Sequence, residues 1–322
     1  MLVAESLQRI NVSDFNLAAT VECGQAFRWR HGPEGWFTGV VAGHRVRVRQ
    51  HEDVLIWDVN AQPPHLPPLP RTTGERKLRA VPSPRIRGEG QGEGNGFVEH
   101  YFALDVPLPK IIATFPDDAP LQDAVKKHWG LRVLRQEPWE TLASFIASST
   151  KQIVQIREIV ELLARRFGLP LGGGYHAFPT VESIARASHK ELWDCKLGFR
   201  AKNLLAAARM IGSDKVRLDK LLTMEYERAL EELMKLPGVG EKIAACALLF
   251  SCGHNEAFPI DVWVERALRR LYFRGKRNVT PKRLRDFAQN YFGPNAGYAQ
   301  QYLFHYMRTV KARRTRPTPS HP

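Results

Sequence analysis

The chain has 322 residues, of which 43% are hydrophobic and 25% charged, so it predicts a soluble globular protein of one large or two ordinary domains. Its 47 lysines and arginines outnumber its 33 acids, and the net charge of +14 indicates a polyanionic partner. The four cysteines form no C-x-x-C pair, which argues against a zinc site or a disulfide framework and favours an intracellular compartment. We expect no signal peptide and no membrane contact, because no long apolar run is present.

Residues 1–60 predict an antiparallel β-sheet. The segments Phe27–Arg30, Trp36–Val41 and Arg45–Arg49 are rich in β-branched and aromatic residues, and turn sequences separate them. Residues 61–96 change character, because prolines and then glycines recur at a density that cannot bury a core. We therefore expect a disordered insertion at 61–96 within a β-rich subdomain at 1–107.

From about residue 108 to residue 312 the pattern is helical. Apolar residues recur at helical spacing most clearly over 140–167, and again near 198–211 and after residues 266 and 298. A basic, proline-containing tail occupies 313–322. The sequence therefore predicts an α+β protein, with an antiparallel sheet subdomain joined to an all-α core.

Within this core, residues 225–252 predict two helices joined by a short turn. The turn contains Gly238, Val239 and Gly240, and its glycines allow positive φ and the close approach of another backbone. Successive backbone N–H groups can then converge on a phosphate oxygen at the start of the second helix. This helix-hairpin-helix is the predicted anchor for a nucleic-acid backbone.

Lys242 lies at the start of the second helix. It shares a helical face with Ala245, Cys246 and Leu249, and no charged residue occurs from 243 to 253. An amine against an apolar surface loses hydration, which favours its uncharged and nucleophilic form. The same position also suits a lysine that extends to solvent or binds a phosphate.

Asp261 follows the hairpin and precedes an amphipathic helix. Aspartate is a favoured N-cap, so this residue alone could be a structural cap. Together with Lys242 in a helix-hairpin-helix, however, it indicates a nucleophile with a carboxylate partner.

The segments Leu236-Pro-Gly-Val-Gly-Glu-Lys242 and Pro259-Ile-Asp261 resemble the catalytic segment of the helix-hairpin-helix DNA glycosylases. Two more segments, Cys23-Gly-Gln-Ala-Phe-Arg-Trp29 and Gly297-Tyr-Ala-Gln-Gln-Tyr-Leu-Phe304, narrow the resemblance to the 8-oxoguanine DNA glycosylase family. The resemblance implies an N-terminal antiparallel sheet on a helix-hairpin-helix glycosylase core. It also implies a base-excision repair enzyme that flips 8-oxoguanine out of duplex DNA and excises it through a Schiff base on Lys242. Asp261 would stabilise positive charge on the sugar, and β-elimination would add AP lyase activity.

The resemblance also implies the partners. We expect double-stranded DNA containing oxidised guanine as the substrate, and a monomeric protein that requires no cofactor. A monovalent or divalent cation bridging the hairpin carbonyls and a phosphate is compatible with the family pattern. No cysteine follows Cys252, so the four-cysteine iron–sulfur loop of some relatives is not expected.

For the base pocket, the resemblance places the Gly24 carbonyl where it accepts the N7 hydrogen that 8-oxoguanine has and guanine lacks. It places Gln300 on the Watson–Crick edge, with Phe304 and Cys246 on the two faces of the ring. Each residue also has an explanation without a ligand: a turn glycine, a surface amide, a core aromatic and a small apolar filler.

For the wedge and the opposite base, the match to the family is partial. Phe199 stands where a tyrosine wedge is common, and Arg200 where an arginine reads the unpaired cytosine. Thr150 stands where the family commonly has an asparagine, Gln155 replaces a second arginine and Trp263 a frequent histidine. These differences predict looser selectivity for the opposite base.

Two alternative functions remain open at this stage. One is a monofunctional glycosylase for alkylated bases on the same fold, which would need no lysine at the hairpin. The other is a non-catalytic DNA-binding protein whose hairpin only grips phosphates.

Overall fold

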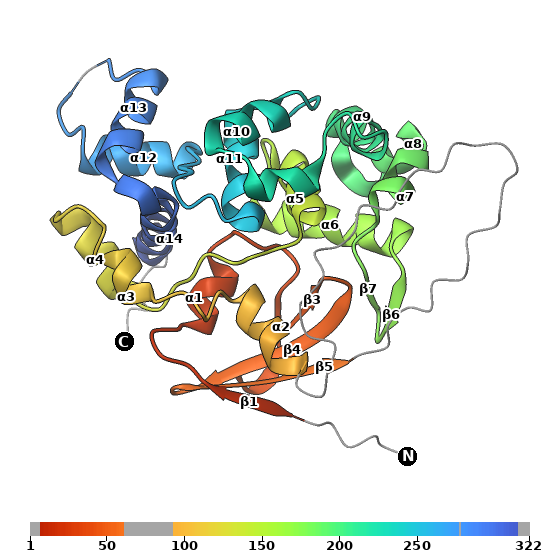
Figure 1. Ribbon diagram of the computed structural model, residues 1–322, viewed down its shortest axis with the longest axis horizontal. Coiled ribbons are helices and arrows are strands. Elements are labelled where there is room, and N and C mark those ends of the chain that lie inside the picture. Colours follow the sequence, from red (N-terminus) through yellow and green to blue (C-terminus); the bar gives the residue numbers. More distant parts are fainter. Residues whose placement is uncertain (1–6, 61–92, 277, 315–322) are drawn as a thin grey trace, which may run out of the picture.

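A five-stranded antiparallel sheet forms one side of the computed structural model, which describes residues 7–60, 93–276 and 278–314 (Figure 1). The strand order is β1-β5-β4-β3-β2. The strands are β1 (Gln8–Asn11), β2 (Arg30–His31), β3 (Phe37–Val41), β4 (His44–His51) and β5 (Val54–Asn60). Val46 and Val48 of β4 are buried, whereas the arginines that alternate with them are half-buried on the other face. One of these, Arg47, pairs with Asp58 of β5 at 2.7 Å.

Helix α2 (Glu93–Tyr101) packs against the sheet. Its Val98 and Tyr101, with Phe102, belong to the same buried cluster as Val48. The helix begins inside the glycine-rich stretch, so the insertion predicted at 61–96 is wrong for 93–96, and residues 61–92 lie outside the described part of the chain. Packing of the apolar residues that follow outweighs the low helix propensity of glycine here.

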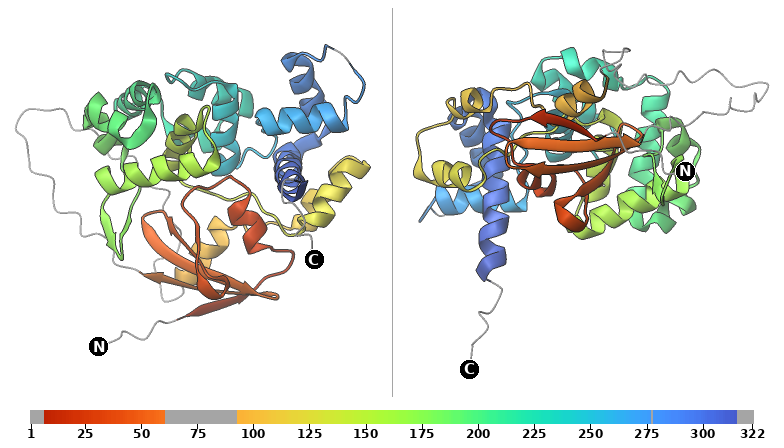
Figure 2. Two further views of the ribbon diagram at one scale, coloured as in Figure 1. Left: turned by 180° about the vertical axis from the view of Figure 1, so that it is seen from behind. Right: turned by 90° about the horizontal axis from the view of Figure 1, so that it is seen from below.

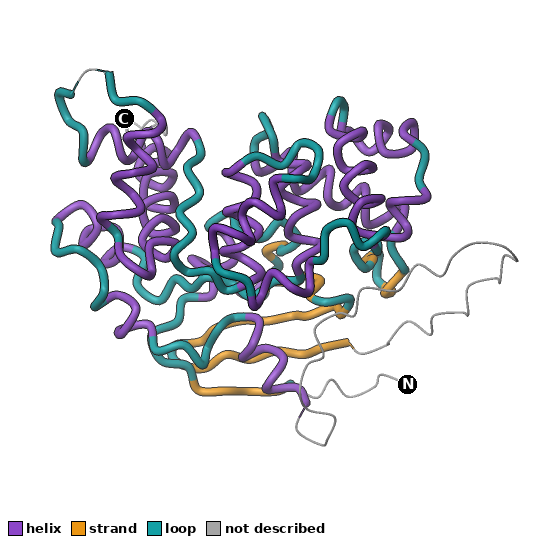
Figure 3. Tube along the Cα trace, turned by 45° about the horizontal axis from the view of Figure 1, so that its top comes forward, coloured by secondary structure: helices purple, strands orange, loops and turns teal. Residues whose placement is uncertain are grey.

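The remaining helices lie on the same side of the sheet as α2 (Figure 3), and Leu17 and Val21 of α1 belong to the same buried cluster as Val98 of α2. They are α1 (Leu17–Glu22), α3 (Leu108–Ile112), α4 (Ala119–Lys127), α5 (Pro138–Ser148), α6 (Ile153–Phe167), α7 (Val181–Arg186), α8 (His189–Leu192), α9 (Arg200–Gly212), α10 (Tyr226–Met234), α11 (Glu241–Ala247), α12 (Val262–Leu271), α13 (Pro281–Tyr291) and α14 (Ala296–Arg314). A short hairpin of β6 (Pro170–Gly172) and β7 (Tyr175–His176) adds two strands to the core that the sequence predicts as all-α. Among the described helices, none is both long and apolar enough to cross a bilayer.

The single helix expected over 140–167 is two helices in the structure. Ser148 ends α5 and its hydroxyl bonds to the Phe145 carbonyl at 2.7 Å, while Thr150 adopts a left-handed φ of 59°. Helix α6 then starts afresh, because Gln152 and Gln155 form a reciprocal cap. Apolar periodicity continues across this break, so the sequence pattern does not reveal it.

Helix α14 joins the two hydrophobic clusters of the helical part. Its Tyr298 packs into the cluster built from α5, α6, α9 and α11, and its Tyr302 and Leu303 into the cluster of α4, α12 and α13. Helices α4 and α12 both pack against α14 (Figure 2). The helix start is fixed by a bond from the Gly297 N–H to the Asn255 carbonyl at 2.7 Å.

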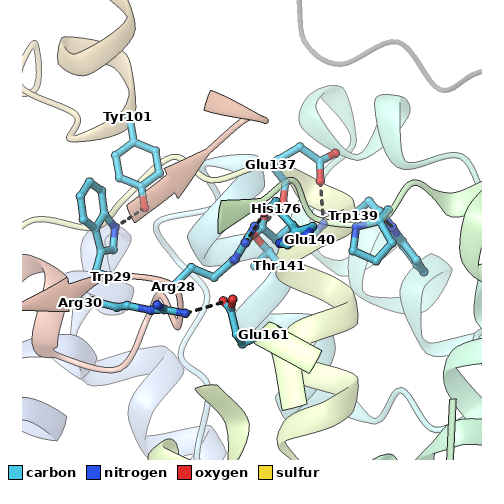
Figure 4. Close-up of polar contacts among 11 residues, drawn as sticks. Arg28, Trp29, Arg30, Tyr101, Glu137, Trp139, Glu140, Thr141, Glu161 and His176 are labelled. Atoms are coloured by element: carbon cyan, nitrogen blue, oxygen red, sulfur yellow. Dashed lines mark hydrogen bonds and ion pairs between the residues drawn. The ribbon is translucent and has the colours of Figure 1, made fainter. Parts of the chain in front are cut away.

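Two arginines join the sheet to the helices: Arg28, in the loop after α1, and Arg30, at the start of β2. Arg28 donates to the His176 carbonyl and lies 3.8 Å from the Glu140 carboxylate, and Arg30 pairs with Glu161 at 3.0 Å (Figure 4). Burial raises the pKa of Glu140 to about 7 although Arg28 lowers it. These contacts fix the loop that carries residues 23–27 against α5.

A glycine substitution tests the packing of α14. An added Cβ at Gly297 would lie 2.8 Å from the Ala257 carbonyl oxygen, whereas at Gly212 the nearest atom is the Val181 Cγ1 at 3.6 Å. We therefore expect Gly297→Ala to lower the free energy of unfolding by about 1–3 kcal/mol. The matched Gly212→Ala should be neutral or stabilising. Urea unfolding followed by circular dichroism measures both, and equal stability of the two variants would contradict this account.

Candidate active site

A cavity of about 510 Å³ opens where α11, α14, the turn between α5 and α6, and the loop after α1 converge. Its volume falls within the range of about 300–1,000 Å³ that is typical of small-molecule sites. The residues around it include all six that the sequence predicts for catalysis and the base pocket: Lys242, Asp261, Gly24, Cys246, Gln300 and Phe304. Residues from four separate segments thus share one cavity.

Lys242 is the second residue of α11, which Gly240 begins with an extended conformation. Its side chain is half-buried, and its Nζ lies 5.2 Å from the centre of the Phe145 ring at the cavity wall. The neighbours Ala245 and Cys246 are buried, as the helical pattern predicts, but the lysine itself is only half-enclosed. Within the described residues, no carboxylate forms an ion pair with this amine. The Nζ is therefore not held away from the cavity by a charged partner.

Asp261 is both a helix cap and a cavity residue. Its Oδ1 accepts bonds from the N–H groups of Trp263 at 2.9 Å and Val264 at 2.8 Å, and so caps α12. Both bonds fall on one oxygen, which leaves Oδ2 without a hydrogen-bond partner among the described residues. Burial raises the pKa of this carboxyl, against the opposing effects of the Val264 N–H and the Lys242 charge.

Gly24 lies where a side chain would be strained and crowded. Its φ is +87°, and an added Cβ would be 3.0 Å from the Ile153 Cδ1 and 3.2 Å from the Phe304 Cε1. The adjacent backbone is fixed, because the Gln301 amide donates to the Cys23 carbonyl at 3.1 Å. This glycine therefore keeps its main chain at the cavity surface.

Gln300 contributes a polar group to the cavity wall, and Cys246 contributes an apolar one. Gln300 is 4% exposed, and its Oε1 is buried without a hydrogen-bond partner. A buried amide oxygen without a partner is costly in a folded protein, and a ligand that donates to it removes that cost. Burial raises the pKa of the Cys246 thiol to about 11, so this residue stays uncharged at neutral pH.

Phe145, Ile153 and Arg308 are among the residues of the cavity wall that sequence reasoning missed. Arg308 lies on α14 in an i, i+4, i+8 series with Gln300 and Phe304, and its guanidinium carbon is 5.3 Å from the centre of the Phe304 ring. That helical spacing is a signal by which the sequence could have revealed it. Phe145 and Ile153 look like ordinary core residues in the sequence, because both belong to the apolar series of α5 and α6.

The predicted wedge residues do not line the cavity. Phe199 is 54% exposed, while Arg200 is 3% exposed with its guanidinium carbon 4.6 Å from the centre of the Phe199 ring. Thr150 is exposed, and Gln155 uses its side-chain oxygen to accept the Gln152 N–H at 3.1 Å. The exposed Phe199 ring is thus accessible for stacking on a base, whereas the Arg200 side chain is buried.

The hairpin has the shape that its glycines predict. Gly238 has a φ of +78°, and a Cβ there would lie 2.3 Å from the Asn203 Nδ2. Val239 is 6% exposed, and Gly240 has open space around it. The N–H groups of Glu241 and Lys242 open α11 and so have no partner within the helix, whereas the Ile243 N–H bonds to the Gly240 carbonyl at 3.0 Å.

Two family descriptions match the chain almost from end to end. Residues 8–142 match the 8-oxoguanine DNA glycosylase, N-terminal domain, and residues 143–294 match the HhH-GPD superfamily base excision DNA repair protein. The N-glycosylase/DNA lyase OGG1 of Arabidopsis thaliana is 27% identical over 312 residues, which cover 92% of this chain and 78% of that protein.

Solved structures agree with these matches. MBOgg1 in complex with a low affinity DNA ligand is 33% identical, with a TM-score of 0.81, over 95% of this chain and 96% of that one. The Clostridium acetobutylicum 8-oxoguanine glycosylase/lyase, in complex with DNA containing cytosine opposite 8-oxoG, is 29% identical, with a TM-score of 0.79, over 95% of this chain and 99% of that one. The chain therefore belongs to the 8-oxoguanine DNA glycosylase family.

Proposed function

We propose that this protein excises 8-oxoguanine from duplex DNA through a Schiff base on Lys242 and then cleaves the strand at the abasic site by β-elimination. One observation carries this proposal: a single cavity brings the Lys242 amine and the Asp261 carboxylate together with Gly24, Gln300 and Phe304. A target atom inside a duplex is out of reach, so the nucleotide must be everted into such a cavity. The names of the relatives, which are N-glycosylases and DNA lyases, support the same reaction.

Lys242 is the proposed nucleophile. Its uncharged amine attacks the sugar C1′, the bond from C1′ to the base nitrogen breaks, and the base leaves with the electron pair and gains a proton. Opening of the sugar ring gives a Schiff base, which allows loss of the 3′ phosphate. Because no carboxylate pairs with the amine among the described residues, the side chain can swing from the Phe145 ring toward the sugar.

Asp261 is the proposed electrostatic partner. Positive charge develops on the sugar as the base departs, and a carboxylate fixed by two N–H bonds needs no reorganisation to stabilise it. Oδ2, which the capping bonds leave unused, is the oxygen that can face the sugar.

Recognition of the base falls to the rest of the cavity. The Gly24 carbonyl would accept the N7 hydrogen, the unpartnered Gln300 Oε1 would accept from the Watson–Crick edge, and Phe304 would stack on the ring. A buried acceptor rejects an analogue that lacks the matching donor, because the acceptor then stays unpaired. Guanine lacks the N7 hydrogen and is rejected for that reason.

The hairpin and the basic surface beyond it would hold the DNA backbone. The N–H groups at the start of α11 suit a phosphate oxygen. Backbone carbonyls of the hairpin would hold a cation there, and the nearby Glu241 is paired with Arg285 at 3.3 Å. Exposed cations on and between α12 and α13 add attraction for phosphates: Arg266, Arg270, Arg274, Lys276, Lys282 and Arg283.

We further propose that the enzyme acts as a monomer inside the cell, without an iron–sulfur cluster or any required cofactor. The absence of C-x-x-C pairs in the sequence supports the lack of a cluster, and the Lys242 chemistry needs no metal.

Lys242→Gln separates catalysis from binding. The variant loses the nucleophile but keeps the hairpin, so excision of 8-oxoguanine should fall by more than about 10³-fold while affinity for the duplex changes little. Gel shift and single-turnover cleavage measure the two quantities. The matched control is Lys235→Gln, an exposed lysine just before the hairpin, which should keep full activity. Full activity of Lys242→Gln would rule out this mechanism and favour a DNA-binding protein or a hydrolytic glycosylase.

Asp261→Asn tests the carboxylate without losing the cap. Asparagine caps a helix as well as aspartate does, so the fold should be retained while base release slows by about 10²–10³-fold.

The pH profile of the wild-type enzyme gives a separate test of Asp261. Because burial raises its pKa, the carboxylate is lost on acidification at a pH above the ordinary 3.8. The single-turnover rate of base release should therefore fall below a midpoint higher than that value, and this acid limb should be absent from Asp261→Asn. An identical acid limb in both proteins would contradict the assignment.

Opposite-base selectivity should be looser than is usual in the family, because Gln155 caps α6 instead of reading a base. One arginine–base pair discriminates by about 1–3 kcal/mol. Gln155→Arg should therefore raise the preference for cytosine about tenfold, measured as excision of 8-oxoguanine opposite each of the four bases. Gln122→Arg, on α4, adds the same charge away from the cavity and should leave the preference unchanged. A wild-type enzyme that is already strict for cytosine would refute the prediction.

A further inference from the structure

Arg308 stands at the edge of the cavity where the Gly24 main chain meets the Phe304 ring. Its Nη1 is 3.3 Å from the position that a Cβ on Gly24 would occupy, and its guanidinium carbon is 5.3 Å from the centre of the Phe304 ring. The side chain lines the same cavity as Lys242 and Asp261. A cation therefore lies beside the backbone that the proposed function assigns to recognition of N7.

The donors of Arg308 are largely unused. A guanidinium has five N–H donors, and the hydrogen bond that the structure shows is a long one of 3.5 Å from Nη1 to the Glu22 carbonyl. Within the described residues, no carboxylate forms an ion pair with it. Burial lowers the pKa of Arg308, yet an arginine stays charged at neutral pH. A half-buried charge with spare donors is suited to an acceptor that a ligand brings into the cavity.

We propose that Arg308 determines specificity by donating an N–H bond to the carbonyl oxygen at C8 of the everted oxidised purine. This inference rests on the proposed function. Oxidation of guanine creates two adjacent features, a hydrogen on N7 and a carbonyl oxygen on C8. An acceptor at Gly24 next to a donor at Arg308 matches this pair, whereas guanine offers a bare N7 and a C8–H at the same edge.

A phosphate contact is the competing role for an arginine in a DNA-binding protein. The two roles differ in what they require of the substrate. A phosphate contact serves any DNA, including an abasic site, whereas a contact to the C8 oxygen is lost when no base is present. Comparison of two substrates thus separates them.

The test uses the full-length protein with Arg308→Leu and the matched control Arg186→Leu, an exposed arginine on α7 that does not line the cavity. Single-turnover excision is measured on a duplex containing 8-oxoguanine, and strand cleavage on the same duplex with an abasic site. We expect Arg308→Leu to slow excision on the order of 10- to 100-fold more than it slows abasic-site cleavage, because one hydrogen bond to a charged group is lost. Arg186→Leu should behave as wild type on both substrates.

A second measurement covers binding alone. In the Lys242→Gln background, Arg308→Leu should reduce the preference for an 8-oxoguanine duplex over a guanine duplex by a similar factor. Equal losses on the 8-oxoguanine and abasic substrates, or an unchanged preference, would overturn the role of Arg308 while leaving the proposed function intact. A wild-type protein that cleaves abasic sites but not 8-oxoguanine DNA would overturn both.

Discussion

The packing of α14 into two hydrophobic clusters is the constraint on which the site depends. Tyr298 fixes this helix against α11 and its neighbours, and Tyr302 fixes it against α4 and α12. Gln300 and Phe304 lie on the same helix, so their positions relative to Lys242 follow from core packing rather than from contacts within the cavity. A rigid frame of this kind holds the proposed recognition and catalytic groups in register before any substrate arrives.

The two groups proposed to carry the reaction are arranged in opposite ways. Asp261 is immobilised, because its Oδ1 caps α12, and its burial makes the carboxylate an effective charge in a partly dry cavity. Lys242 is half-buried beside the Phe145 ring and has no ion pair in the described part of the chain. A fixed acid and a movable amine suit a reaction in which the amine must travel to the sugar while the charge it faces stays in place.

Much of this arrangement was predictable from the sequence. The strand pattern, the hairpin glycines and the spacing of Lys242 and Asp261 are local signals, and resemblance to a family linked them to Gly24, Gln300 and Phe304. Other features depend on tertiary contacts. The break between α5 and α6 at Thr150 is invisible to apolar periodicity, and the start of α2 inside a glycine-rich stretch reflects packing on the sheet. Arg308 follows Gln300 and Phe304 at helical spacing, but its charge alone does not show whether the side chain turns toward the cavity or toward solvent.

In the proposed reaction the Lys242 amine becomes covalently joined to the sugar of the damaged nucleotide. The most direct measurement is reduction with borohydride during reaction with an 8-oxoguanine duplex, followed by proteolysis and mass spectrometry of the DNA-linked peptide. We expect a single reduced adduct, on the peptide that contains Lys242. Strand cleavage with an adduct on another residue, or with no adduct at all, would contradict it.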